Sequence, residues 1–454
     1  MTVSLSFARL RRVPAGRLVR LTTLGALVLA IGAAAACQNF LTAYNPCAVE
    51  ADDLNDPAYA TLIANGPIYA FQDSWDDITY WNGQFVDEII NRNGPNPFIE
   101  EGQIDRRELY SDMTYIPAFI YSPTQRARFL AEDAVRRLTV ILGDTVGRDL
   151  RVARALAYGG YTYIALGEMM CTTPIDRSVP KTWEEMMTAA VTKFDSAIVI
   201  ANAAKAYYAT LTPAQPNAIL AADSVIAFAN VGAARASLNK NDKAKATQYA
   251  QLVPAAFVFS AYYTDNTTGQ IHRTYNRIGT GNGVGTLAGT PFEAMAGDPR
   301  VPRATTPAGR VGTPLSPESY STFNNTVAGA NFLPVMSVRI ASGLEARYIV
   351  AEAAGPTAAT LTFVNERRAV GLQAPVTLTG DALMAELRDQ KARDFYLDNH
   401  RLGDLRRYKK YYSVDLFPKG PYPGSTTGQI YNEAIDCWPL PTNEINDNPN
   451  VPRG

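Results

Sequence analysis

The stretch RDFYLDNHRLGDLRR occupies residues 393–407 and carries much of the information about the fold. Leu383, Leu387 and Phe395 lie on one stripe at helical spacing, which predicts a helix over residues 381–399. The residues after it would lie at or just past the helix C-terminus, where cations satisfy the last carbonyl groups and a carboxylate can pair with a guanidinium. We therefore expect a cluster of ion pairs that holds the fold together, formed by Arg401, Asp404, Arg406 and Arg407.

Helical periodicity extends over two long regions, residues 123–255 and 343–399. The first helix is expected to begin after Ser122-Pro123 and to stop at Gly143. In the next one, small residues such as Gly160 would allow a neighbouring helix to approach closely. Short turns join the helices, as in tetratricopeptide units, although the full 34-residue consensus is absent. The predicted fold is mainly α, an irregular tetratricopeptide-like helical-repeat scaffold.

The chain changes character between residues 256 and 338, where glycines and then prolines interrupt any helix. Long loops in a compact protein are usually functional, so this insert is a candidate ligand-side surface. Helical periodicity then returns at residue 343. The proline-rich residues 417–454 predict an extended, ordered C-terminal segment.

The first 36 residues have the order of a secretory signal peptide. Five arginines between Arg9 and Arg20 precede an uncharged apolar stretch over residues 21–36, which is short for a membrane span. The junction Ala34-Ala35-Ala36-Cys37 resembles the lipobox of bacterial lipoproteins, in which the cysteine is acylated. We expect residues 1–36 to be cleaved and Cys37 to anchor the mature chain, residues 37–454, in a membrane. Ordinary cleavage to a soluble periplasmic protein is the alternative.

Composition excludes several functions. Lys and Arg total 42 against 43 acidic residues, with no basic run after the start, so nucleic-acid binding is disfavoured. The two histidines, His272 and His400, are far apart, and the sequence holds no HExxH, GxSxG or phosphate-loop motif. We expect no catalytic residues, no metal and no cofactor.

Two C-terminal blocks resemble the SusD/RagB family of outer-membrane lipoproteins that bind nutrients. Residues 393–407 resemble the family's E-R-R-x-E-F…G-x-R-x-x-D-L-R-R block, and Trp438-Pro-Leu-Pro-Thr-Asn-Glu-Ile with Asn448-Pro-Asn resembles its closing P-I-P-x-x-E-I…N-P-x segment. Residues 153–175, residues 351–368 and the start at Cys37 are similar to further family blocks. The chain departs from the pattern at four positions: Asp394 and Asn399, where the family has Glu and Gly, and Cys171 and Cys437.

The resemblance implies a SusD-like fold and a role as a non-enzymatic binding protein. Such a protein would bind an oligomeric nutrient, most simply an oligosaccharide, and deliver it to a TonB-dependent SusC-like outer-membrane channel. Gln38 after the lipid site, rather than Asp, agrees with outer-membrane sorting. Two alternatives within this reading are a peptide-binding, RagB-like protein and an envelope scaffold without a small ligand. A glycoside hydrolase is a further hypothesis, for which Glu352 and Glu366 are the carboxylates considered.

Three cysteines remain once Cys37 is acylated, and an oxidising compartment permits one disulfide among them. Spacing alone leaves all three pairings open. Because Cys171 and Cys437 flank blocks that the family packs together, we expect a Cys171–Cys437 disulfide, with Cys47 as the free thiol.

An aromatic cluster marks the candidate ligand site, because residues 69–85 contain six aromatic side chains. Sugar rings stack on aromatic faces, and amide and guanidinium groups reach their hydroxyls. Phe71, Trp75 and Ile78 share a helical stripe and are expected to be core. The resemblance places ligand residues in this region and in the insert. The predicted site therefore consists of Trp81, Asn82, Tyr263, Arg273 and Tyr275.

Overall fold

The computed structural model describes residues 53–91, 99–264, 272, 285–286, 289–295, 297–301, 303–304, 320–321, 337–423, 425 and 428–453. The described residues from Asn55 onward form one compact unit. The predicted signal peptide, Cys37 and Cys47 lie outside the described residues.

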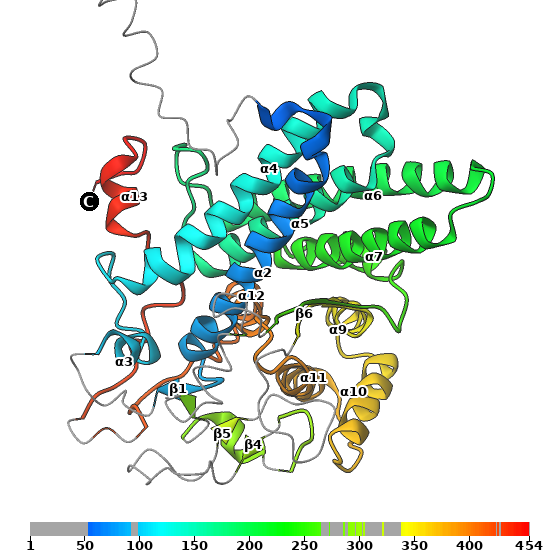
Figure 1. Ribbon diagram of the computed structural model, residues 1–454. Coiled ribbons are helices and arrows are strands. Elements are labelled where there is room, and N and C mark those ends of the chain that lie inside the picture. The colour runs from blue at the N-terminus through cyan, green and yellow to red at the C-terminus, as the bar shows by residue number, and fades with distance from the viewer. Residues whose placement is uncertain are drawn as a thin grey trace, which may run out of the picture. The chain divides into compact units, whose positions relative to one another are not determined.

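Helices dominate the described chain. Two helices precede the expected scaffold: α2 (Ala60–Phe85) and α3 (Glu100–Asp105). The first expected region forms α4 (Ser122–Leu142), α5 (Leu150–Met169), α6 (Trp183–Thr210), α7 (Pro216–Asn239) and α8 (Lys243–Ala250). The second forms α9 (Gly343–Ala354), α10 (Ala358–Val370), α11 (Gly380–Asp394) and α12 (Arg401–Tyr412), and α13 (Thr442–Asp447) lies in the C-terminal segment. In Figure 1 the long helices α6 and α7 lie side by side. The predicted mainly α fold is confirmed.

Strands are short and occur in three antiparallel pairs within the described residues. They are β1 (Ile90–Asn91) with β3 (Gly285–Thr286), β2 (Val258–Ala261) with β6 (Val338–Ser342), and β4 (Arg303–Ala304) with β5 (Tyr320–Ser321). In the longest pair, Val258 lies opposite Ser342 and Ala261 opposite Val338. β2 and β6 thus bring the two ends of the insert together. In Figure 1, β1, β4 and β5 lie away from α6 and α7.

The end of α11 corrects the expectation for residues 381–399. The helix stops at Asp394, and a new helix begins at Arg401. Leu397 and Asn399 between them adopt positive φ angles of 51° and 66°, which an α-helix cannot continue through. Arg401, Asp404, Arg406 and Arg407 therefore lie on α12 itself rather than past the end of α11.

One helix, α7, has the length and apolar composition to cross a membrane, as judged over the described residues. In the structure 56% of its apolar window is buried. The helix packs against α5, α6, α8 and α9, so we interpret it as a core helix.

The ring of Phe194 on α6 lies between glycines of two neighbouring helices. A Cβ built on Gly160 of α5 would come within 2.6 Å of this ring, and one on Gly232 of α7 within 2.2 Å. The close approach expected at Gly160 is confirmed, and α5, α6 and α7 meet at this one aromatic side chain.

The C-terminal segment is fixed to the end of α5. Cys171 and Cys437 form a disulfide, the pair expected above. The Trp438 N–H donates to the Met169 carbonyl at 2.9 Å, and the Cys171 N–H donates to the Trp438 carbonyl at 2.9 Å. Arg406 Nη1 donates to the carbonyl oxygens of Gly167, Glu168 and Met170 at 2.8–3.0 Å. The cation expected at a helix C-terminus thus caps α5 rather than its own helix.

We predict that Gly232→Ala lowers the stability of the protein by about 1–3 kcal/mol, because the new methyl group overpacks against Phe194. Gly159→Ala is the matched control. Its Cβ would meet only ordinary contacts at 3.4–3.5 Å, and alanine favours a helix over glycine. Urea unfolding of both variants measures this difference. Equal stabilities would contradict the packing described for Phe194.

Candidate ligand-binding surface

Trp81 does not lie at the surface, which corrects the predicted site. It is 1% exposed, and its ring packs against those of Tyr80, Tyr115 and Phe119 at centroid distances of 4.9, 4.7 and 5.7 Å. The reason is that the second half of α2 is buried on nearly all sides by other segments of the fold. Phe71, Trp75 and Ile78 are buried, as expected.

Asn82 is also buried, and it has a structural role instead of the predicted binding role. Its Nδ2 donates to Asn399 Oδ1 at 2.7 Å, and its Oδ1 accepts from Trp438 Nε1 at 2.9 Å. Asn399 belongs to the 393–407 block and Trp438 to the closing block. The two blocks that carry the family resemblance therefore meet at this one amide.

Tyr263 contacts the backbone of α2 nine residues before Trp81. Its hydroxyl donates to the Gln72 carbonyl at 2.8 Å, and its ring lies 5.0 Å from that of His272. Trp81 follows Gln72 by nine residues, a rise of about 13 Å along the helix. Because Trp81 is buried, the structure does not bring Trp81 and Tyr263 together in one surface site. Arg273 and Tyr275 lie outside the described residues.

The aromatic residues around Trp81 form a different, partly exposed surface. Tyr115 and Phe119 are half-buried over the Trp81 ring, and Tyr110 nearby along the chain is 44% exposed. Carboxylate and amide groups of α3 hold the tyrosines: the Tyr115 hydroxyl donates to Glu101 Oε1 at 2.9 Å, and the Tyr110 hydroxyl donates to Gln103 Oε1 at 2.6 Å. We call these residues the α3 surface: Glu101, Gln103, Tyr110, Tyr115 and Phe119.

Local backbone structure fixes the α3 surface. Residues Ile116–Tyr121 form a π-helical turn directly before α4, a feature frequent at functional sites. The Glu100 carboxylate accepts from the Thr114 N–H at 3.1 Å and from the Thr114 hydroxyl at 2.8 Å, which joins α3 to the segment before that turn. The aromatic side chains are therefore held on a rigid base.

Behind this surface lies the buried carboxyl group of Asp105. It accepts the Asn91 N–H at 2.7 Å and the Tyr422 hydroxyl at 2.9 Å. Burial raises the pKa of Asp105 well above its ordinary value. Asp105 joins β1, α3 and the C-terminal segment.

Chemically, the α3 surface suits a polyhydroxylated ligand. Aromatic faces stack on the apolar C–H faces of sugar rings, and carboxylate and amide oxygens accept hydrogen bonds from hydroxyl groups. Sequence reasoning missed this surface, although a signal was present. Residues 110–121 hold four aromatic side chains, where the chain average of 10% gives about one.

The expected ion-pair cluster is confirmed for Asp404 and Arg407, which are buried, whereas Arg406 binds carbonyl groups of α5 and Arg401 pairs with Asp87. Arg407 forms a bidentate pair with Glu352 at 2.8 and 2.9 Å and contacts Asp404 at 2.7 Å. Beside it, Arg235 Nη2 donates to Glu345 Oε2 at 2.8 Å. Although burial alone would raise the pKa of Glu345, Arg235 and the adjacent His400 hold it below its ordinary value. These pairs join α7, α9 and α12.

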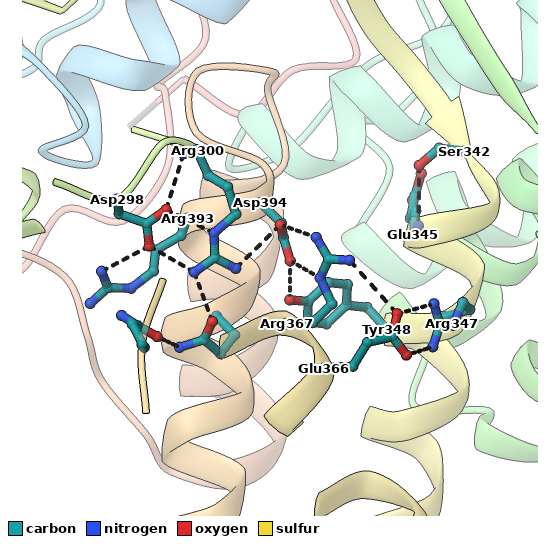
Figure 2. Close-up of polar contacts among 12 residues, drawn as sticks. Asp298, Arg300, Ser342, Glu345, Arg347, Tyr348, Glu366, Arg367, Arg393 and Asp394 are labelled. Carbon is teal, nitrogen blue, oxygen red and sulfur yellow. Dashed lines mark hydrogen bonds and ion pairs between the residues drawn. The ribbon is translucent and has the colours of Figure 1, made fainter. Parts of the chain in front are cut away.

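A second network holds the described part of the insert against the scaffold (Figure 2). Arg300 binds Asp298 at 2.7 Å, and Asp298 also accepts from Arg393 at 3.2 Å. Asp394 accepts two hydrogen bonds from Arg367 at 2.8 Å and lies 3.3 Å from Arg300. Asp394, at which the chain departs from the family pattern, is thus the carboxylate that links the insert, α10 and α11.

The carboxylates considered for a hydrolase are both in ion pairs. Glu352 binds Arg407, and Glu366 binds Arg347 at 2.7 Å, as Figure 2 shows for the second pair. Both carboxylates therefore have the surroundings of acidic side chains that stabilise the fold.

Comparisons with known proteins agree with this architecture. No protein-family model and no curated protein matches the chain. Solved structures do match. A SusD superfamily protein from Bacteroides fragilis has 14% identity and a TM-score of 0.62 over 88% of this chain and 99% of its own. The surface glycan-binding protein A from Bacteroides thetaiotaomicron, solved in complex with laminarihexaose, has 14% identity and a TM-score of 0.60 over 86% and 98%. A laminarin-binding SusD-like protein has 12% identity and a TM-score of 0.60 over 86% and 98%.

At these identities the similarity shows the fold. The chain has the SusD-like fold, as its C-terminal blocks predicted.

We predict that Trp81→Ala destabilises the protein by about 3–5 kcal/mol, because it removes a fully buried indole from the core. Tyr69→Ala, on the same helix but 54% exposed, should change the stability little. Denaturant unfolding compares the two variants. A Trp81→Ala protein as stable as the wild type would show that Trp81 is not a core residue.

Glu88 should make stability depend on pH. Burial raises its pKa from 4.5 to about 8, although Arg401 opposes this. Between these values the folded chain retains a proton that the unfolded chain releases, so the free energy of unfolding falls as pH rises from about 4.5 to 8. Glu88→Gln cannot titrate, yet its amide oxygen can still accept the Leu397 N–H. The fall should therefore be smaller in the variant, measured by urea unfolding across this range. If the free energy of unfolding depended on pH in the same way in the wild type and in Glu88→Gln, the raised pKa of Glu88 would be contradicted.

Proposed function

We propose that this protein is a lipid-anchored, surface-facing outer-membrane protein that binds an oligosaccharide and passes it to a TonB-dependent SusC-like transporter. The main support is the similarity to a glycan-binding protein solved with laminarihexaose, which extends over 86% of this chain. The α3 surface adds an independent argument, since it combines partly exposed aromatic rings with hydrogen-bond acceptors.

The role is one of binding, not catalysis. Charged side chains of the 393–407 block form ion pairs within the fold: Arg407 binds Glu352 and Asp404, and Asp394 binds Arg367. A peptide ligand, as in a RagB-like protein, is the second candidate, because hydroxyl-binding acceptors and aromatic rings also suit peptide side chains.

Binding should depend on the α3 surface and on the predicted Tyr275. After a ligand is identified on glycan and peptide arrays, Tyr110→Ala and Tyr275→Ala should each weaken its affinity by well over twofold without lowering the melting temperature, because the first removes a ring of the α3 surface and the second removes a ring that the sequence predicts to stack on the ligand. Isothermal titration calorimetry measures the affinities. Tyr207→Ala is the matched control, since this tyrosine of α6 is 38% exposed and does not belong to the α3 surface.

Affinities that do not change in either variant would discard both the α3 surface and Tyr275 as binding contacts. A loss of affinity in Tyr207→Ala as well would show a general effect on folding rather than a binding contact. A screen in which only peptides bind would favour the second candidate.

The membrane anchor is tested separately. Replacing Cys37 by Ala removes the thiol to which the lipid would be attached, so the protein should move from the membrane fraction to the soluble fraction. Fractionation of cells producing each form measures this. Finding the wild-type protein soluble in the periplasm would contradict the lipoprotein assignment.

A further inference from the structure

The loop that carries Tyr110 is held on both sides by the C-terminal segment. On one side the Asn432 N–H donates to the Arg106 carbonyl at 2.8 Å, directly after the end of α3. On the other side the Thr442 N–H donates to the Ser111 carbonyl, also at 2.8 Å. The position of Tyr110 at the edge of the α3 surface therefore depends on where the C-terminal segment lies.

The Cys171–Cys437 disulfide lies in the middle of this attachment. We call residues 432–442 the strap, and Cys437 is its central residue, midway between the two hydrogen bonds to the loop. Beside Cys437, Trp438 binds the end of α5 through the backbone of Met169 and Cys171. The disulfide thus adds a covalent attachment to the scaffold at the point where the strap otherwise has hydrogen bonds and side-chain packing.

A covalent bond and a set of hydrogen bonds restrain the strap in different ways. Hydrogen bonds of a surface segment break and re-form in local opening events. The disulfide joins residues 266 positions apart in the sequence, so it keeps the centre of the strap beside α5 even while its hydrogen bonds are open. Opening at Asn432 and Thr442 should therefore be much rarer in the oxidised protein than in the reduced protein.

The disulfide lies where a reductant can reach it. Cys171 is exposed and Cys437 is half-buried, whereas the neighbouring Trp438 is fully buried. Exposed disulfides are more readily reduced by thiols than those inside a core. Reduction would thus release the centre of the strap without requiring the core around Trp438 to unfold first.

We propose that the Cys171–Cys437 disulfide is a redox-sensitive restraint on the α3 surface. A dithiol reductant supplies two electrons and two protons: the S–S bond breaks, both cysteines become thiols, and the reductant is oxidised to its own disulfide. In the oxidised protein the strap holds the Tyr110 loop in place, and in the reduced protein the strap and this loop open more often. The restraint itself does not depend on the proposed function, whereas its effect on ligand affinity rests on it.

Amide hydrogen exchange tests the restraint without a ligand. Reduction of the wild type with dithiothreitol should speed exchange in the peptides that contain the Asn432 and Thr442 amides by about fivefold or more, because these amides lose protection whenever the strap opens. Peptides from the buried part of α7 are the internal control and should not change. The double variant Cys171→Ser, Cys437→Ser should exchange like the reduced wild type, with or without dithiothreitol.

Unchanged exchange of the strap in fully reduced protein would overturn the proposal. An equal increase in the α7 peptides would overturn it as well, because it would show a general loss of stability.

Calorimetry with laminarihexaose, the ligand of a similar solved structure, tests the link to binding separately. Its affinity should fall several-fold when the wild type is reduced, and dithiothreitol should have no effect on the double variant. If reduction speeds exchange of the strap but leaves the affinity for laminarihexaose unchanged, the restraint is supported and the placement of the ligand on the α3 surface is contradicted.

Discussion

The buried pair between Arg407 and Glu352 is the interaction on which the rest of the structure depends. A guanidinium and a carboxylate removed from water are stable only when both are paired and their remaining donors are satisfied, and removing one partner typically costs about 3–5 kcal/mol. Here the remaining donors reach Asp404 and Asn239 at 2.7 and 2.8 Å. Because these partners come from α7, α9 and α12, the requirement fixes the relative register of three helices. Apolar packing alone would tolerate several registers.

The same need to pair buried charges connects the scaffold to the insert. The 393–407 block contributes Arg393 and Asp394 to the network around Arg300, and Arg407 to the pair with Glu352. Between them, Asn399 reaches Asn82 on α2. One short stretch of sequence thus holds the insert, the scaffold and the first described long helix. This explains why a motif rich in charge lies in the interior rather than on the surface.

Much of the fold could be predicted from the sequence because it depends on local periodicity. The start of α4 at Ser122, its end before Gly143 and the close approach at Gly160 all follow from neighbouring residues along the chain. The boundary between α11 and α12 could not be predicted in this way, since the leucine at position 397 gives no local sign of its positive φ. The prediction of the ligand site was wrong for a similar reason. Whether Trp81 is exposed is decided by Tyr115 and Phe119, and whether Asn82 is free is decided by Asn399 and Trp438, all distant in sequence.

The contacts of Asn82 have a consequence for the order of assembly. Its two partners lie 317 and 356 residues further along the chain. A chain that emerges from its N-terminus first therefore cannot complete the surroundings of α2 until its last residues have arrived. Contacts of such long range slow folding, and they leave apolar surface exposed in the meantime. Until then, Trp75, Trp81 and Phe85 on this helix are available to holding chaperones or to other unfinished chains, so production of the protein should be sensitive to the rate at which the chain is synthesised.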